Sequence, residues 1–125
     1  MNKDEILKTD ISSACERALA WFASMQAPEM PKGVSRISAA HKPKDFPGML
    51  LSGSYNALMG RALLGDVPNS LLQAEREALT AWFLSFRLPD GRFRNPQMND
   101  TNIYKKDDLQ ETWGYIDFHI TNYSL

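Results

Sequence analysis

The sequence predicts an all-α protein made of two tandem αα-hairpins, with about four main helices. The first observation behind this is an internal repeat. Residues 16–29 (ERALAWFASMQAPE) and 77–90 (EALTAWFLSFRLPD) match at a constant spacing of 61, and six of fourteen positions are identical. The identical pairs are Glu16/Glu77, Ala20/Ala81, Trp21/Trp82, Phe22/Phe83, Ser24/Ser85 and Pro28/Pro89. The second observation is that each copy is an amphipathic helix followed by a polar loop and a second apolar segment. A repeat of this length is typical of stacked architectures, where one unit cannot bury its apolar face alone.

Length and composition indicate one ordinary globular domain covering residues 1–125. The chain is 43% apolar and 23% charged, with a net charge of −1, so nothing in its charge indicates nucleic-acid binding. The single cysteine, Cys15, excludes an internal disulfide. No segment has the continuous apolar length that would span a membrane, and the polar N-terminus does not resemble a leader. We therefore expect a cytoplasmic protein with no membrane partner.

The first repeat is predicted at about residues 11–65. Its first helix is expected to begin after Asp10 or at Ser12–Ser13, where Glu16 would close a capping box, and to end before Pro28. A polar loop follows to residue 44. The second helix is predicted from Met49 or Leu51 to Leu64 and, because Arg61 is its only charged residue, to be buried.

The second repeat is predicted at about residues 70–125. Asn69 or Ser70 is expected to cap a third helix that ends near Phe86, and residues 88–91 (LPDG) have the composition of a tight turn. A polar loop over 92–106 then leads to a fourth helix, beginning at Asp107 or Asp108 and running to the end of the chain.

Residues 81–93 (AWFLSFRLPDGRF) carry a resemblance. An outer helix of this type, followed by a P-D-G-x-F turn and an inner helix, resembles the repeats of α/α-toroid proteins. These include terpenoid cyclases, prenyltransferase β subunits, six-hairpin glycosidases and polysaccharide lyases. The resemblance implies a partial toroid, since two hairpins are too few to close a ring. Further repeats, with this chain as the N-terminal part of a longer toroid, or a homo-oligomer would then complete the stack.

The last predicted helix concentrates the residues that could carry chemistry. At 100° per residue, six polar side chains share one arc of it: Asp108, Glu111, Thr112, Tyr115, His119 and Asn122. His119 is the candidate general base and Tyr115 its acid partner, with Glu111 assisting; Asn122 and Asp108 would bind substrate. Tyr55 of the second helix aligns with Tyr115 at a spacing of 60, so it is a further candidate for substrate binding. The alternative is a hydrogen-bonded structural network.

The two loops add candidate arginines. Residues 33–36 (GVSR) and 92–95 (RFRN) are predicted to occupy equivalent places after the two outer helices. Arg36, Arg92 and Arg94 would then orient sugar carboxylates or phosphates, or else be solvated loop charges. His41, among Lys42, Pro43 and Lys44, is expected at the surface.

These observations favour cleavage of a glycan, by hydrolysis or β-elimination, without a metal or other cofactor. The set of Tyr, His and Asn is similar to that of α/α-toroid polysaccharide lyases, whereas Glu111 paired with Asp107 or Asp108 would suit a glycosidase. Two alternatives stay open: a non-catalytic helical-repeat module that assembles with itself or a partner, and an isoprenoid-handling toroid. The resemblance implies for the latter a zinc site or a D-x-D-D acid, and residues 105–108 (KKDD) lack the first aspartate.

Overall fold

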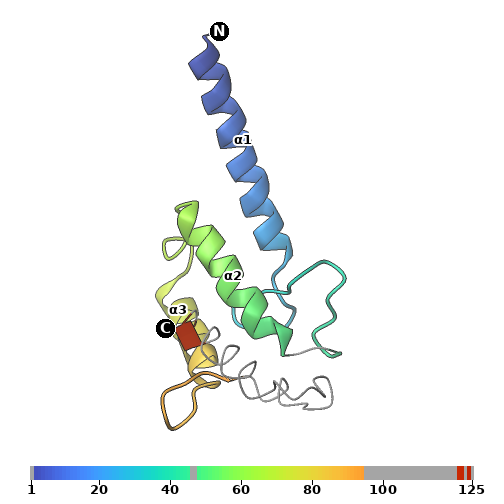
Figure 1. Cartoon of the computed structure of the whole chain (residues 1–125), viewed down its shortest axis with the longest axis vertical. Helices are drawn as coiled ribbons and strands as arrows, with labels where there is room; N and C mark the ends of the chain where they lie inside the picture. Colours follow the sequence, from blue (N-terminus) through green and yellow to red (C-terminus); the bar gives the residue numbers. More distant parts are fainter. Residues whose placement is uncertain (1, 46–47, 95–120, 123, 125) are drawn as a thin grey trace, which may run out of the picture.

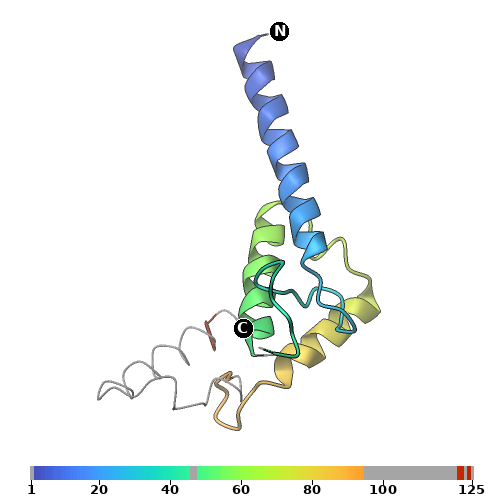
Figure 2. The same ribbon diagram turned by 90° about the vertical axis from the view of Figure 1, so that its right-hand side faces the viewer.

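The computed structural model describes residues 2–45, 48–94, 121–122 and 124. Within these ranges the chain forms three helices: α1 (Lys3–Ser24), α2 (Met49–Leu63) and α3 (Gln73–Leu84). Thr121, Asn122 and Ser124 are also helical. The described residues contain two isolated β-bridges and no strand, which confirms the all-α class. α1 and α2 run in opposite directions, and α3 lies near the N-terminal end of α2 (Figures 1 and 2).

α1 begins earlier than predicted. Asn2 and Glu5 form the capping box, with the Glu5 carboxylate accepting the Asn2 N–H at 2.8 Å. The predicted start near Asp10 to Ser13 is therefore wrong. The Ser13 hydroxyl serves a side chain instead, since it accepts a hydrogen bond from Arg17 at 2.6 Å.

α2 is largely buried, as predicted from its low charge, and it begins at the predicted Met49. Six of its residues are buried: Leu50, Leu51, Gly53, Ser54, Tyr55 and Ala57. In contrast, α1 contains no buried residue and α3 only Leu79. α2 is thus the most buried of the three helices.

α3 begins at Gln73, later than the predicted cap at Asn69 or Ser70. Backbone hydrogen bonds from Ser70 to Asp66 and from Leu71 to Pro68 keep these residues in turns. The Glu75 carboxylate then accepts the Leu72 N–H at 2.8 Å at the start of the helix. This hydrogen bond, assisted by Lys32, lowers the pKa of Glu75.

The two outer helices end in the same backbone turn. After α1, the Ala27 N–H donates to the Val34 carbonyl and the Arg36 N–H donates back to that of Met25, both at 2.8 Å. After α3, Leu88 donates to Arg92 at 2.7 Å, and Arg94 donates back to Phe86 at 3.0 Å. We call residues 25–36 the first turn and residues 86–94 the second turn.

Equivalent glycines set the register of the two turns. Gly33 has φ +101° and Gly91 has φ +89°, a region in which an L side chain is strained. Gly33–Arg36 therefore corresponds to Gly91–Arg94, one residue earlier than the predicted match with Arg92–Asn95. The first turn is longer by three residues, and this extra length shifts the register.

Both turns pack on α2. One cluster of buried apolar residues joins the first turn, α2, the 66–72 connection and α3: Ala27, Val34, Leu50, Leu71 and Leu79. The second cluster joins Leu51 of α2 to Phe93 of the second turn. Trp82 and Phe83 of α3 pack against both clusters. α2 thus contacts both the first turn and the second turn.

Candidate functional site

The predicted proton-transfer residues lie on the last predicted helix. Glu111, Tyr115 and His119 lie outside the described residues, and so does Asp108. Among the residues that are described, no group of three or more His, Cys, Asp or Glu side chains could hold a metal ion. The catalytic assignment therefore stays a prediction.

One hydrogen bond connects the second turn to the last predicted helix. The Phe93 N–H donates to Thr121 Oγ1 at 2.9 Å, while Phe93 itself is only 2% exposed. Three predicted substrate-binding residues adjoin this pair in the chain: Arg92 and Arg94 flank Phe93, and the exposed Asn122 follows Thr121. The second turn and the helical segment that contains Thr121 therefore lie next to each other.

The first turn makes the equivalent contact with α2. The Ser35 N–H donates to Ser54 Oγ at 2.9 Å, and that hydroxyl donates to the Leu50 carbonyl at 2.6 Å. Ser35 and Phe93 occupy the same place in the two turns, so Ser54 corresponds to Thr121. Their spacing is 67 residues, not the 60 that aligned Tyr55 with Tyr115.

Arg36 closes the first turn and caps α1. Its Nη2 donates to the Ser24 carbonyl at 2.9 Å and its Nη1 to that of Ala39 at 3.2 Å. The last turn of α1 contains no basic residue, so Arg36 supplies the cation that the helix C-terminus favours. Its Nε is buried without a hydrogen-bond partner among the described residues.

The other candidates differ in their surroundings. Arg92 is exposed and forms an ion pair with Asp90, with Nη2 2.7 Å from Oδ2. The hydrogen bond from Arg92 lowers the pKa of the Asp90 carboxyl. Arg94 is half-buried, and Tyr55 is 7% exposed within α2. His41, expected at the surface, is 7% exposed, and its Nδ1 accepts the Ile37 N–H at 3.3 Å.

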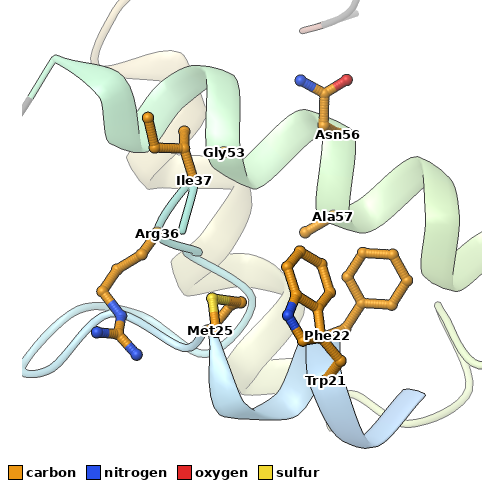
Figure 3. A pocket seen from close by; sticks show the side chains of 8 residues that line it. All are labelled: Trp21, Phe22, Met25, Arg36, Ile37, Gly53, Asn56 and Ala57. Atoms are coloured by element: carbon orange, nitrogen blue, oxygen red, sulfur yellow. The ribbon is translucent and has the colours of Figure 1, made fainter. Parts of the chain in front are cut away.

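A small pocket of about 140 Å³ lies between α1, the first turn and α2. Its lining residues are Trp21, Phe22, Met25, Arg36, Ile37, Gly53, Asn56 and Ala57. In Figure 3 the rings of Trp21 and Phe22 rise from α1 toward Ala57, whereas Arg36 turns away from them. The pocket is lined largely by apolar side chains, and no carboxylate or imidazole contributes to it.

Gly53 lets the first turn approach α2 beside this pocket. A Cβ at Gly53 would overlap the Ser35 carbonyl oxygen and lie 3.0 Å from the Arg36 carbonyl carbon. Gly60 has a similar role, because a Cβ there would overlap the Phe22 ring. These contacts fix α1 and the first turn on α2. They were not predicted from the sequence.

Comparison with family models, curated proteins and solved structures gives no match. None of the helices in the described part of the chain is long and apolar enough to cross a membrane. The resemblance to α/α toroids accordingly remains a prediction.

Proposed function

We propose that this chain is a helical-repeat assembly module, a segment that packs side by side with further helices in a partial α/α toroid. One observation carries this proposal: the two outer helices end in turns with the same hydrogen bonds, and each turn donates to a hydroxyl of an inner helical segment. Units with the same internal geometry can stack by repeating one contact, which is how helical-repeat arrays grow.

Exposed apolar residues at both ends of the module support this function. On α1, Leu7, Ile11 and Trp21 are 59%, 55% and 51% exposed. Around α3, Leu72 and Leu84 are 71% and 50% exposed. A single exposed apolar residue is ordinary, but several of them on one helix favour association. Further helices would cover both.

Sedimentation over a concentration series of the full chain tests this function. We expect reversible association that weakens when lysine replaces residues of an open face, either Leu7 and Ile11 together or Leu72 and Leu84 together. Ala20→Lys is the control, because Ala20 is exposed on α1 away from Leu7 and Ile11. A chain that stays monomeric at every concentration would contradict the function.

Glycan cleavage is the second candidate, favoured by the hydrogen bond between Phe93 and Thr121. It brings the turn that carries Arg92 and Arg94 to the helical segment that carries Asn122. Arginine and amide groups together suit the carboxylate and hydroxyl oxygens of an acidic sugar. His119 and Tyr115 would then move the protons.

A substrate panel tests this second candidate. The full chain is incubated with neutral and uronate-containing polysaccharides, and new reducing ends and unsaturated sugar ends are measured. On a responsive substrate, His119→Ala and Tyr115→Phe should each abolish most turnover, while Arg94→Ala should mainly raise KM. Unchanged turnover in the first two variants would exclude the proposed proton chemistry.

A further inference from the structure

The N-terminal part of α1 projects from the rest of the described chain (Figures 1 and 2). α2 packs against the other end of α1, where Phe22 fits over Gly60 and Met25 is 4% exposed. Leu7 and Ile11 precede Phe22 by about three turns of helix or more, and both stay more than half exposed. No element among the described residues covers them.

Six apolar residues of α1 follow a seven-residue repeat. Their spacing alternates between four and three through Leu7, Ile11, Ala14, Ala18, Trp21 and Met25. This is the pattern of positions a and d in a coiled coil. We call these six residues the α1 stripe. It runs from the core at Met25 to the projecting end of the helix.

Size along the α1 stripe favours antiparallel self-pairing. The large residues Leu7 and Ile11 come first, and the small residues Ala14 and Ala18 follow. When two copies pair antiparallel, Ile11 meets Ala14 of the second copy and Leu7 meets Ala18. Each layer then combines one large and one small side chain, which allows the two helices to interlock without a void.

Charges beside the stripe fit the same register. Asp10 and Arg17 directly precede Ile11 and Ala18, so they lie on one flank of the stripe, and Arg17 is exposed. In the antiparallel register, Asp10 faces Arg17 of the second copy, and the two-fold symmetry produces this ion pair twice. In a parallel pair, Asp10 would instead face Cys15.

We propose that the part of the α1 stripe from Leu7 to Ala18 binds the same part of a second copy of this chain in an antiparallel pair, with Asp10 and Arg17 forming two symmetric ion pairs. This inference rests on the proposed assembly function and names its partner. It also accounts for the length of α1, which has 22 residues while its packing on α2 is confined to the C-terminal end.

Charge exchange in the full chain tests the pairing. Asp10→Arg places two arginines opposite each other at both ion pairs, and Arg17→Asp places two aspartates there. Each variant should therefore raise the dimer Kd about tenfold at low salt. The double variant restores both pairs and should return the Kd to within about threefold of the original. Glu16→Arg, on the opposite side of α1, is the control with the same change of net charge as Asp10→Arg.

Mixing the two single variants gives the sharpest result. An Asp10→Arg chain and an Arg17→Asp chain complement each other at both pairs, so the mixed dimer should form more tightly than either homodimer. Sedimentation equilibrium measures this, and circular dichroism checks that helix content is unchanged. Ile11→Lys should abolish the dimer.

Three results would overturn the inference. If both single charge variants associate as the original chain does, the pairing has another geometry. If association survives Ile11→Lys but is lost with Leu72→Lys and Leu84→Lys, the second copy binds the other face, and the assembly function stands without this inference. If the original chain is monomeric throughout, both proposals fail.

Discussion

The first and second turns share one pattern of backbone hydrogen bonds but are held by different side chains. In the longer first turn, the Gln26 amide spans the loop: its Nε2 donates to the Pro31 carbonyl at 3.2 Å, and its Oε1 accepts the Gly33 N–H at 2.9 Å. In the shorter second turn, Asp90 accepts the Arg92 N–H at 3.0 Å. The hydrogen-bond frame is therefore the feature common to both, and the loop inside it is free to vary.

The two Trp–Phe pairs show the same principle in the helices. Trp21 and Phe22 meet edge to face with ring centroids 5.2 Å apart, and Trp82 and Phe83 do so at 5.1 Å. Yet Trp21 is 51% exposed, whereas Trp82 packs on both core clusters. The repeated sequence therefore gives the same ring geometry in both helices, whereas the burial of each tryptophan depends on the elements that pack against it.

The largest expected effect breaks the contact between the first turn and α2. Gly53→Ala adds a Cβ that overlaps backbone atoms of Ser35 and Arg36, which cannot move as a side-chain end would. We expect a loss of about 3 kcal/mol or more in the free energy of unfolding, measured by urea titration at a fixed protein concentration.

Gly65→Ala is the matched control for that substitution. Gly65 has φ +75° but no atom within 4 Å of an added Cβ, so only backbone strain should act, at about 1 kcal/mol. Equal losses at the two glycines would show that the close approach of turn and helix contributes little.

The tryptophans give the next largest contrast. Trp82→Ala should cost about 3 kcal/mol, because it empties space shared by two core clusters and removes the contact with Phe86 at 5.0 Å. Trp21→Ala should cost about 1 kcal/mol, since half of that side chain is already in water. Chemical denaturation of both variants measures the difference, and a reversed order would contradict the observed burial.

A smaller effect compares the two hydroxyl contacts. Ser54→Ala leaves the buried Ser35 N–H without its acceptor and should cost about 2 kcal/mol. Thr121→Ala removes the equivalent acceptor of the Phe93 N–H at a partly buried site and should cost about 1 kcal/mol. Thr121→Ser keeps the hydroxyl and should restore most of that loss. Failure of serine to restore it would mean that the threonine methyl, not the hydrogen bond, matters.

The sequence predicted the presence of the three described helices, but it did not predict where α1 begins or which residues of the two turns correspond. α2 could be predicted within one residue because its low charge and the Gly65 after it are local signals. α1 could not, since Ser12, Ser13 and Glu16 have the composition of a cap that Asn2 and Glu5 provide. The outer-helix repeat was visible as identical residues, and its Trp–Phe contact recurs in both copies.

The hydrogen bonds from the two turns to Ser54 and Thr121 could not be predicted from the sequence, for a physical reason. Ser54 and Thr121 are equivalent because each accepts the N–H of the equivalent turn residue, but Ser54 follows Ser35 by 19 residues and Thr121 follows Phe93 by 28. The alignment of Tyr55 with Tyr115 at a spacing of 60 therefore differs from the spacing of 67 between the two hydroxyl acceptors. Candidate site residues on the last predicted helix could be chosen by residue type. Their position depends on how that helix aligns with the second turn, and no local sequence pattern encodes this alignment.

The smallest effect concerns the connection between the two units. Arg61 Nε donates to Asp66 Oδ2 at 2.6 Å, and this hydrogen bond lowers the pKa of the Asp66 carboxyl. A lowered folded-state pKa stabilises the fold above the unfolded value of about 4, and this contribution is lost as the pH falls through the folded pKa. Asp66→Asn should therefore cost about 1 kcal/mol at pH 7 and progressively less below about pH 4.

Urea titrations from pH 7 to pH 3 measure that convergence. Asp90→Asn is the comparison, since Asp90 pairs with Arg92 at the exposed second turn and its side chain is 50% exposed. Solvent screens that pair more strongly, so its loss at pH 7 should be the smaller of the two. If Asp66→Asn stayed equally destabilised at pH 3, the ion pair would not be the cause, and the side-chain hydrogen bond between Ser70 and Asp66 would account for the loss instead.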